Sequence, residues 1–85
     1  MIVMKFGGTS MGDAGRIAHV AALVDEIHRR EGAVVVVVSA MSGVTNALFA
    51  AARAAADGGA TDAQARIAAL SERHLETARA LLQTP

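Results

Sequence analysis

Six consecutive residues near the start of the chain have the types that hold a phosphate group: Lys5, Phe6, Gly7, Gly8, Thr9 and Ser10. Glycines let the backbone approach a phosphate closely, and the N-terminus of a following helix offers unpaired N–H groups to an anion. A lysine adds a positive charge beside it, and phosphoryl transfer needs such positioning and electrostatic stabilisation. We predict a phosphate-binding loop here; the alternative is a plain glycine-rich turn with a solvated lysine.

The spacing within this loop excludes two common phosphate-binding motifs. No Lys-Ser or Lys-Thr pair follows Gly12, so the loop is not a Walker loop. Thr9 interrupts the Gly-x-Gly-x-x-Gly register of the dinucleotide fingerprint. Any phosphate site here is therefore of another kind.

A second group of hydroxyl side chains lies in the segment Ser39-Ala40-Met41-Ser42-Gly43-Val44-Thr45-Asn46. The hydroxyls of Ser39, Ser42 and Thr45 surround the expected start of a helix, where a small anion such as a carboxylate could bind. The alternative is that Ser42 or Thr45 only caps that helix.

Two predicted strands would bring these loops to one edge of a sheet. Residues 2–6 are short and apolar and stop at Gly7-Gly8, which favours a strand. Residues 33–39 contain five consecutive valines, a pattern typical of a parallel strand buried on both faces. Between them, apolar residues at helical spacing predict a helix that starts with a capping box at residues 10–13 and stops at Gly32. The result is a βαβ unit, in which ligands bind outside the carboxyl ends of the strands.

The rest of the chain is predicted to be helical. One helix runs from about Thr45 to Asp57 and ends at Gly58-Gly59. A second capping-box candidate at residues 61–64 starts a helix over residues 62–82, with Pro85 just past its end. Its expected apolar face consists of Ile67, Leu70, His74, Ala78 and Leu81. Because two strands alone leave both sheet edges open, we expect the chain to be the opening part of a larger α/β domain.

Composition excludes several other classes of protein. The 85 residues have no cysteine, so disulfide scaffolds and thiolate sites are excluded. Zero net charge and only two aromatic residues argue against a nucleic-acid partner. No apolar run approaches the roughly 20 residues of a membrane span, so we expect no membrane partner and a cytoplasmic location. The three histidines lack metal-ligand spacing, and we expect no metal site on the chain.

Two stretches of the sequence resemble the aspartate kinases of the amino-acid kinase superfamily. They are Val3-Met4-Lys5-Phe6-Gly7-Gly8-Thr9-Ser10-Met11 and Val38-Ser39-Ala40-Met41-Ser42-Gly43-Val44-Thr45-Asn46, in the family's order and spacing. The similarity runs from residue 1 to about 82, where Arg73-His74-Leu75-Glu76 also resembles a helix of the family. It implies that residues 1–85 are the N-terminal βαβ-plus-helices portion of an αβα sandwich with a mainly parallel sheet. We expect the rest of the kinase domain and the regulatory ACT domains to be absent from these residues.

The resemblance also implies a reaction and a set of roles. The reaction is ATP-dependent phosphorylation of L-aspartate to 4-phospho-L-aspartate, with Mg²⁺, as the first step toward lysine, threonine and methionine. Lys5 is implied as the catalytic residue that neutralises charge on the phosphoryl group, and Ser39 and Thr45 as aspartate contacts. Lys5, Phe6, Gly7, Gly8, Thr9 and Ser10 are implied as the ATP-binding residues. The full-length enzyme is expected to be a homo-oligomer, and the chain alone to be inactive.

Other functions remain open on the sequence alone. One is another amino-acid kinase, since acetylglutamate, glutamate and uridylate kinases share a looser Lys-x-x-Gly opening. Another is the kinase part of a bifunctional aspartate kinase–homoserine dehydrogenase. A third, from a different class, is a non-catalytic nucleotide-binding or assembly module that keeps the βαβ unit.

Overall fold

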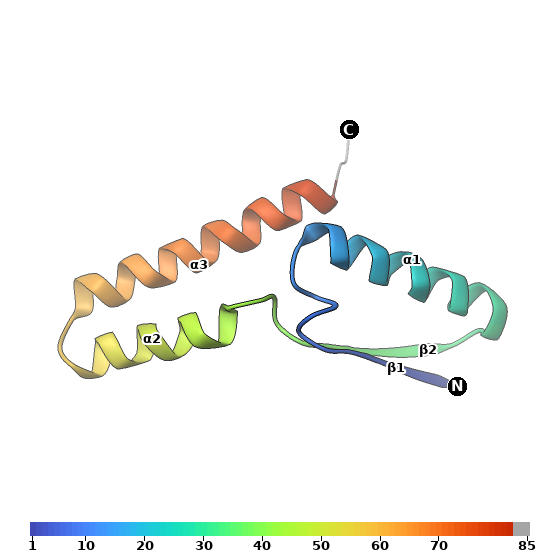
Figure 1. The fold of residues 1–85 in the computed structure, drawn as a ribbon, viewed down its shortest axis with the longest axis horizontal. Helices are drawn as coiled ribbons and strands as arrows, with labels where there is room; N and C mark the ends of the chain where they lie inside the picture. Colours follow the sequence, from blue (N-terminus) through green and yellow to red (C-terminus); the bar gives the residue numbers. More distant parts are fainter. Residues whose placement is uncertain (83–85) are drawn as a thin grey trace. The chain divides into compact units, whose positions relative to one another are not determined.

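The computed structural model describes residues 1–82 and divides the chain into two compact units, Met1–Ser42 and Gly43–Pro85, which we consider separately. The first unit holds β1 (Ile2–Phe6), α1 (Ala14–Glu31) and β2 (Val34–Val38), and the second holds α2 (Val44–Ala56) and α3 (Ala60–Leu81) (Figure 1). This confirms the predicted α/β class and the βαβ order at the start of the chain. The prediction that Pro85 follows the end of the last helix concerns a residue outside the described ones.

The two strands of the first unit form a parallel pair. Ile2 lies opposite Val34 and Phe6 opposite Val38, so both strands end at the same edge (Figure 1). The helix α1 connects them and packs against both strands. Its buried Val20, together with the buried Met11 and Met41 of the two loops, forms the core of this unit.

The start of α1 differs from the prediction. Asp13 is its N-cap, and the carboxylate oxygen Oδ1 of Asp13 accepts a hydrogen bond from the main-chain N–H of Arg16 at 2.9 Å. The capping box predicted at residues 10–13 is therefore wrong, because Ser10 and Met11 belong to a turn that buries Met11 before the helix begins. The predicted stop is confirmed: Gly32 has a φ of 84°, in the left-handed region that favours glycine.

The valine strand is more exposed than its sequence predicts. Val35, Val36, Val37 and Val38 retain 39–51% of their accessible surface. Val35 and Val37 face away from α1, and no other helix of the first unit covers that face. Val36 and Val38 line a groove with α1, which covers them only in part. The expectation of burial on both faces is thus wrong for this chain.

The second unit is a pair of packed helices. Gly43 precedes α2 with a φ of 80°, and Gly58 turns the chain after it with a φ of 83°. The buried Val44 and Ala51 form the small core between α2 and α3. Among the described residues, no helix combines the length and the apolar character that crossing a membrane requires.

The last helix also departs from the prediction at its start. It begins at Ala60 with Gly59 as N-cap, and no side chain of the described residues caps it. The capping box predicted at residues 61–64 is wrong because those residues already lie inside the helix. On the predicted apolar face, Leu70, Ala78 and Leu81 are half-buried, whereas Ile67 and His74 are exposed.

Candidate functional site

The two loops predicted to carry chemistry begin at the same edge of the sheet. The main-chain N–H of Ser39, the first residue after β2, donates to the carbonyl oxygen of Phe6 at 3.1 Å. Phe6 is the last residue of β1, so Ser39 lies directly beside the start of the glycine loop. This juxtaposition follows from the parallel pairing and confirms that the first loop and Ser39 meet at one edge.

The loops also touch further along, at Gly12 and Ser42. Gly12 is buried, and a Cβ built on it would lie 2.9 Å from the Ser42 hydroxyl oxygen and 3.4 Å from the Thr9 carbonyl oxygen. A side chain at position 12 would therefore force the Ser42 side chain to move. No pattern in the sequence indicates that Gly12 joins the loops, because Ser42, which it contacts, is 30 residues away.

Hydrogen bonds hold the glycine loop in a tight turn. The main-chain N–H of Met11 donates to the carbonyl oxygens of both Gly7 and Gly8, each at 3.2 Å. The carbonyl oxygen of Thr9 accepts a hydrogen bond from Nη1 of Arg16 at 2.7 Å. Three consecutive carbonyl groups, those of residues 7, 8 and 9, are thus engaged by partners within the unit.

The N–H groups of the same three peptides face the other way. The described chain has no cis peptide bond, and in a trans peptide the C=O and N–H point in opposite directions. Within residues 1–82, the main-chain N–H groups of Gly8, Thr9 and Ser10 have no acceptor. Successive free N–H groups of this kind form a concave site for an anion.

The glycines of the loop are not required by the chain's own packing. A Cβ at Gly7 or Gly8 would meet no atom within 4 Å, and neither residue has a positive φ. The space beside the backbone is therefore open at both positions. Small residues there permit something outside the chain to approach the loop closely.

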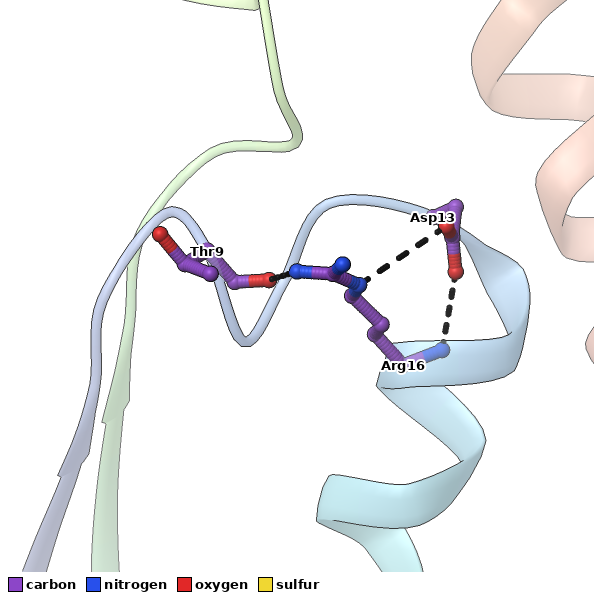
Figure 2. Close-up of polar contacts among 3 residues, drawn as sticks. All are labelled: Thr9, Asp13 and Arg16. Atoms are coloured by element: carbon purple, nitrogen blue, oxygen red, sulfur yellow. Dashed lines mark hydrogen bonds and ion pairs between the residues drawn. The ribbon is translucent and has the colours of Figure 1, made fainter.

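Arg16 and Asp13 join this loop to the start of α1 (Figure 2). Besides the bond to Thr9, Nε of Arg16 lies 4.0 Å from the carboxylate oxygen Oδ2 of Asp13. Figure 2 shows the Thr9 side chain on the side of its backbone opposite to the Arg16 guanidinium. The Asp13 carboxylate also caps α1, so the helix start already holds a negative charge; the anion site that remains is the set of loop N–H groups.

Lys5 lies on the sheet face that α1 does not cover. Its neighbour Phe6 lines a groove of about 540 Å³ together with Val20 and Leu23 of α1. Because side chains alternate along a strand, Lys5 projects from the opposite face, where it is exposed. Within residues 1–82, its ammonium group has no hydrogen-bond or ion-pair partner. Thr9 and Ser10 also line the groove on the α1 side.

Thr45 belongs to the second unit, as the second residue of α2. It is exposed, and no side chain of the described residues caps this helix. The alternative in which Ser42 or Thr45 only caps α2 is therefore wrong: Gly43 takes the N-cap position. Arg73 of α3 approaches this point, with Nη1 3.8 Å from a Cβ built on Gly43.

The described residues contain no group of three histidine, cysteine, aspartate or glutamate side chains that could hold a metal ion. What the first unit offers instead is a set of main-chain donors and the ammonium group of Lys5, none of which has a partner in the described part of the chain. These groups can bind and stabilise an anion, and they include no acid–base pair.

Comparison with known proteins identifies the relatives of this chain. Residues 1–83 match the model of the amino acid kinase family. An aspartokinase of Pseudomonas aeruginosa is 55% identical over 49 residues, which cover 58% of this chain and 12% of that protein. An aspartate kinase of Pseudomonas putida is 52% identical over 58 residues, which cover 67% of this chain and 14% of that protein. An aspartokinase of Helicobacter pylori is 56% identical over 49 residues, which cover 58% of this chain and 12% of that protein. The matched segments thus span only 12–14% of these relatives' lengths.

Proposed function

The chain belongs to the amino acid kinase family, and from that membership we propose that it forms the phosphate-binding segment of a kinase that phosphorylates L-aspartate. The observation that carries the proposal is that, within residues 1–82, neither the N–H groups of Gly8, Thr9 and Ser10 nor the ammonium group of Lys5, which precedes them in the chain, has a partner. The relatives named aspartokinase or aspartate kinase support aspartate as the acceptor.

The N–H groups and Lys5 are suited to the same ligand. The carbonyl of Thr9 points to Arg16 of α1, so the N–H of Ser10 points away from that residue. Lys5 likewise projects from the sheet face that α1 does not cover. The ammonium group of Lys5 would thus be able to reach the oxygens of a phosphate bound to the loop. The open space at Gly7 and Gly8 supports a close approach of the ligand.

The proposed reaction needs few groups from the protein. An oxygen of the aspartate side-chain carboxylate bonds to the γ-phosphorus of ATP, and the bond from that phosphorus to the bridging oxygen breaks. ADP leaves with the bonding electrons. The carboxylate is already ionised at neutral pH, so no general base is needed. The role left for this chain is to orient the phosphates and offset negative charge, which the loop and Lys5 are equipped to do.

Mg²⁺ would reach this site on ATP. The described residues offer no ligand cluster of their own, and Mg²⁺ is commonly held by substrate phosphates with one or two carboxylates. Bound there, the ion neutralises part of the phosphate charge. We therefore assign it to the MgATP complex and to no side chain of residues 1–82.

Ser39 and Thr45 are each proposed, by the same resemblance, to contact the acceptor aspartate. Ser39 lies beside the start of the glycine loop, where its main-chain N–H donates to the carbonyl oxygen of Phe6. Thr45 lies in the first turn of a helix whose leading N–H groups carry a partial positive charge, which favours a carboxylate. From the same resemblance, we further propose that the full-length enzyme is a cytoplasmic homo-oligomer. Its product would be a precursor of lysine, threonine and methionine.

A chimera tests this function. Residues 1–85 would replace the corresponding portion of the Pseudomonas aeruginosa aspartokinase, and ATP-dependent acyl-phosphate formation would be trapped with hydroxylamine. We expect turnover with L-aspartate and none with L-glutamate or N-acetyl-L-glutamate. A folded chimera that hydrolyses or transfers no phosphate with aspartate would contradict the proposal.

A further inference from the structure

We propose that Arg16 is a positioning residue of the phosphate-binding loop, which acts by fixing the direction of the Ser10 N–H. This inference rests on the proposed function, because it concerns the loop assigned to the phosphates of ATP. It assigns to Arg16 no contact with the phosphates. Its role is to act through the main chain of Thr9.

The peptide between Thr9 and Ser10 carries the argument. Nη1 of Arg16 donates to the Thr9 carbonyl oxygen at 2.7 Å, a short distance that is typical of a charge-assisted hydrogen bond (Figure 2). The peptide is planar and trans, so holding its carbonyl also holds its N–H in the opposite direction. The other two carbonyls of the turn, on Gly7 and Gly8, are held by Met11. Without Arg16, the third peptide is the one free to rotate.

Asp13 in turn restrains Arg16. One carboxylate oxygen of Asp13 accepts from the main-chain N–H of Arg16 at 2.9 Å, and the other lies 4.0 Å from its Nε. The guanidinium is a rigid planar group, so a contact at Nε limits where Nη1 can point. The same aspartate therefore caps α1 and orients the arginine that reaches the loop.

Another arginine of the same helix shows the contrast. Arg29 pairs with Asp25 at 3.0 Å, one helical turn away, and both side chains are largely exposed. Such a pair joins two side chains on a helix surface and restrains no loop. Arg16 differs because it bonds to a main-chain carbonyl seven residues earlier, outside its helix. Arg29 is thus a matched control for the loss of an arginine and its ion pair from α1.

The experiment compares four forms of the 85-residue chain: wild type, Arg16→Met, Arg16→Lys and Arg29→Met. Methionine keeps an unbranched apolar stem and removes every donor, whereas lysine keeps the charge and can still donate to one carbonyl. Backbone ¹⁵N relaxation without ligand reports the order of Thr9 and Ser10. Titration with MgATP, and separately with inorganic tripolyphosphate, gives the Kd from the amide shifts of residues 8–10. Thermal unfolding checks that each variant is folded.

We expect Arg16→Met to lower the order of the Thr9 and Ser10 amides and to raise both Kd values about tenfold, the scale of one charge-assisted hydrogen bond. Arg16→Lys should recover most of this loss, and Arg29→Met should match the wild type. Unchanged loop order and Kd in Arg16→Met would overturn the inference. A raised Kd with unchanged loop order would also overturn it, because Arg16 would then bind phosphate itself.

The two proposals fail differently in this experiment. If the wild-type amides of residues 8–10 do not respond to either ligand, the proposed phosphate site is wrong. In that event the ligand-free relaxation data still decide whether Arg16 fixes the loop. If the wild type binds and Arg16→Met binds equally well, the phosphate site stands and the role of Arg16 is rejected.

Discussion

Ser39 and Thr45 are the residues through which the chain is proposed to bind the acceptor. In the aspartokinase chimera, Thr45→Val should raise the KM for aspartate about 5- to 100-fold. The change removes a hydroxyl with little change of shape, so the carboxylate of the bound aspartate loses a hydrogen bond. The KM for ATP should change much less. Ser39→Ala should behave in the same way. Steady-state kinetics with each substrate varied in turn measure this split, and equal changes in both KM values would mean that these residues only support the fold.

The residues of the phosphate loop differ in how far sequence could identify them. Lys5, Gly7 and Gly8 stand together at the end of a strand, so their types and order predict a phosphate loop directly. Arg16 could not be identified in this way. Its partner is a main-chain carbonyl whose direction is set only when the turn closes on Met11. Sequence patterns describe side chains, and this contact depends on the orientation of a peptide plane.

At the level of elements, the N-cap of α1 gives a testable difference between two aspartates. Asp13→Ala should lower the free energy of unfolding by about 0.5–2 kcal/mol, because it removes a side-chain acceptor from the first turn. Asp62→Ala is the control: Asp62 also pairs with an arginine, at 3.2 Å, but it caps no helix. It should change stability by less than about 0.5 kcal/mol.

Chemical denaturation of both variants, followed by circular dichroism, measures this difference. An equal loss in the two would mean that the ion pairs, and not the cap, account for the effect. Asp13→Asn provides a further check, because asparagine caps helices as well as aspartate but carries no charge. It should retain most of the stability that Asp13→Ala loses.

The strands and helices could be predicted because their signals are local. Five consecutive valines favour a strand, and Gly32 and Gly58 mark turns that need a positive φ. The two capping boxes failed for a different reason. Residues 10–13 and 61–64 have the residue types and spacing of a capping box. However, α1 begins only after the turn that buries Met11, and α3 already begins after Gly59. The position of a cap depends on where the chain turns, which the residues of a capping box alone do not determine.

For the whole molecule, the uncovered face of the sheet in the first unit has a consequence in solution. Val3 and Val35 lie opposite each other on it and are 68% and 44% exposed. Exposed apolar strands recruit further strands or apolar surfaces. The 85-residue chain should therefore self-associate at micromolar concentration.

Val35→Lys should weaken this association at least tenfold, because a charged side chain on the face disfavours its burial. Leu82→Lys is the control, since it changes an exposed apolar residue that follows the end of α3 and lies outside the sheet. Sedimentation velocity over a concentration series measures both. A wild-type chain that remains a monodisperse monomer throughout would contradict the prediction.

Lys5 and the glycine loop are proposed to stabilise the phosphoryl group during its transfer from ATP. The most direct test is the single-turnover rate of phosphoryl transfer to aspartate in the chimera with Lys5→Ala. A charge that acts most strongly as negative charge shifts onto the phosphate oxygens lowers the barrier more than it tightens binding. We therefore predict a rate lower by about 10²–10⁴-fold with a much smaller change in ATP affinity, and poor recovery in Lys5→Arg. A folded Lys5→Ala chimera that transfers phosphate at nearly the original rate would show Lys5 to be a solvated residue at the end of β1, and would contradict the account.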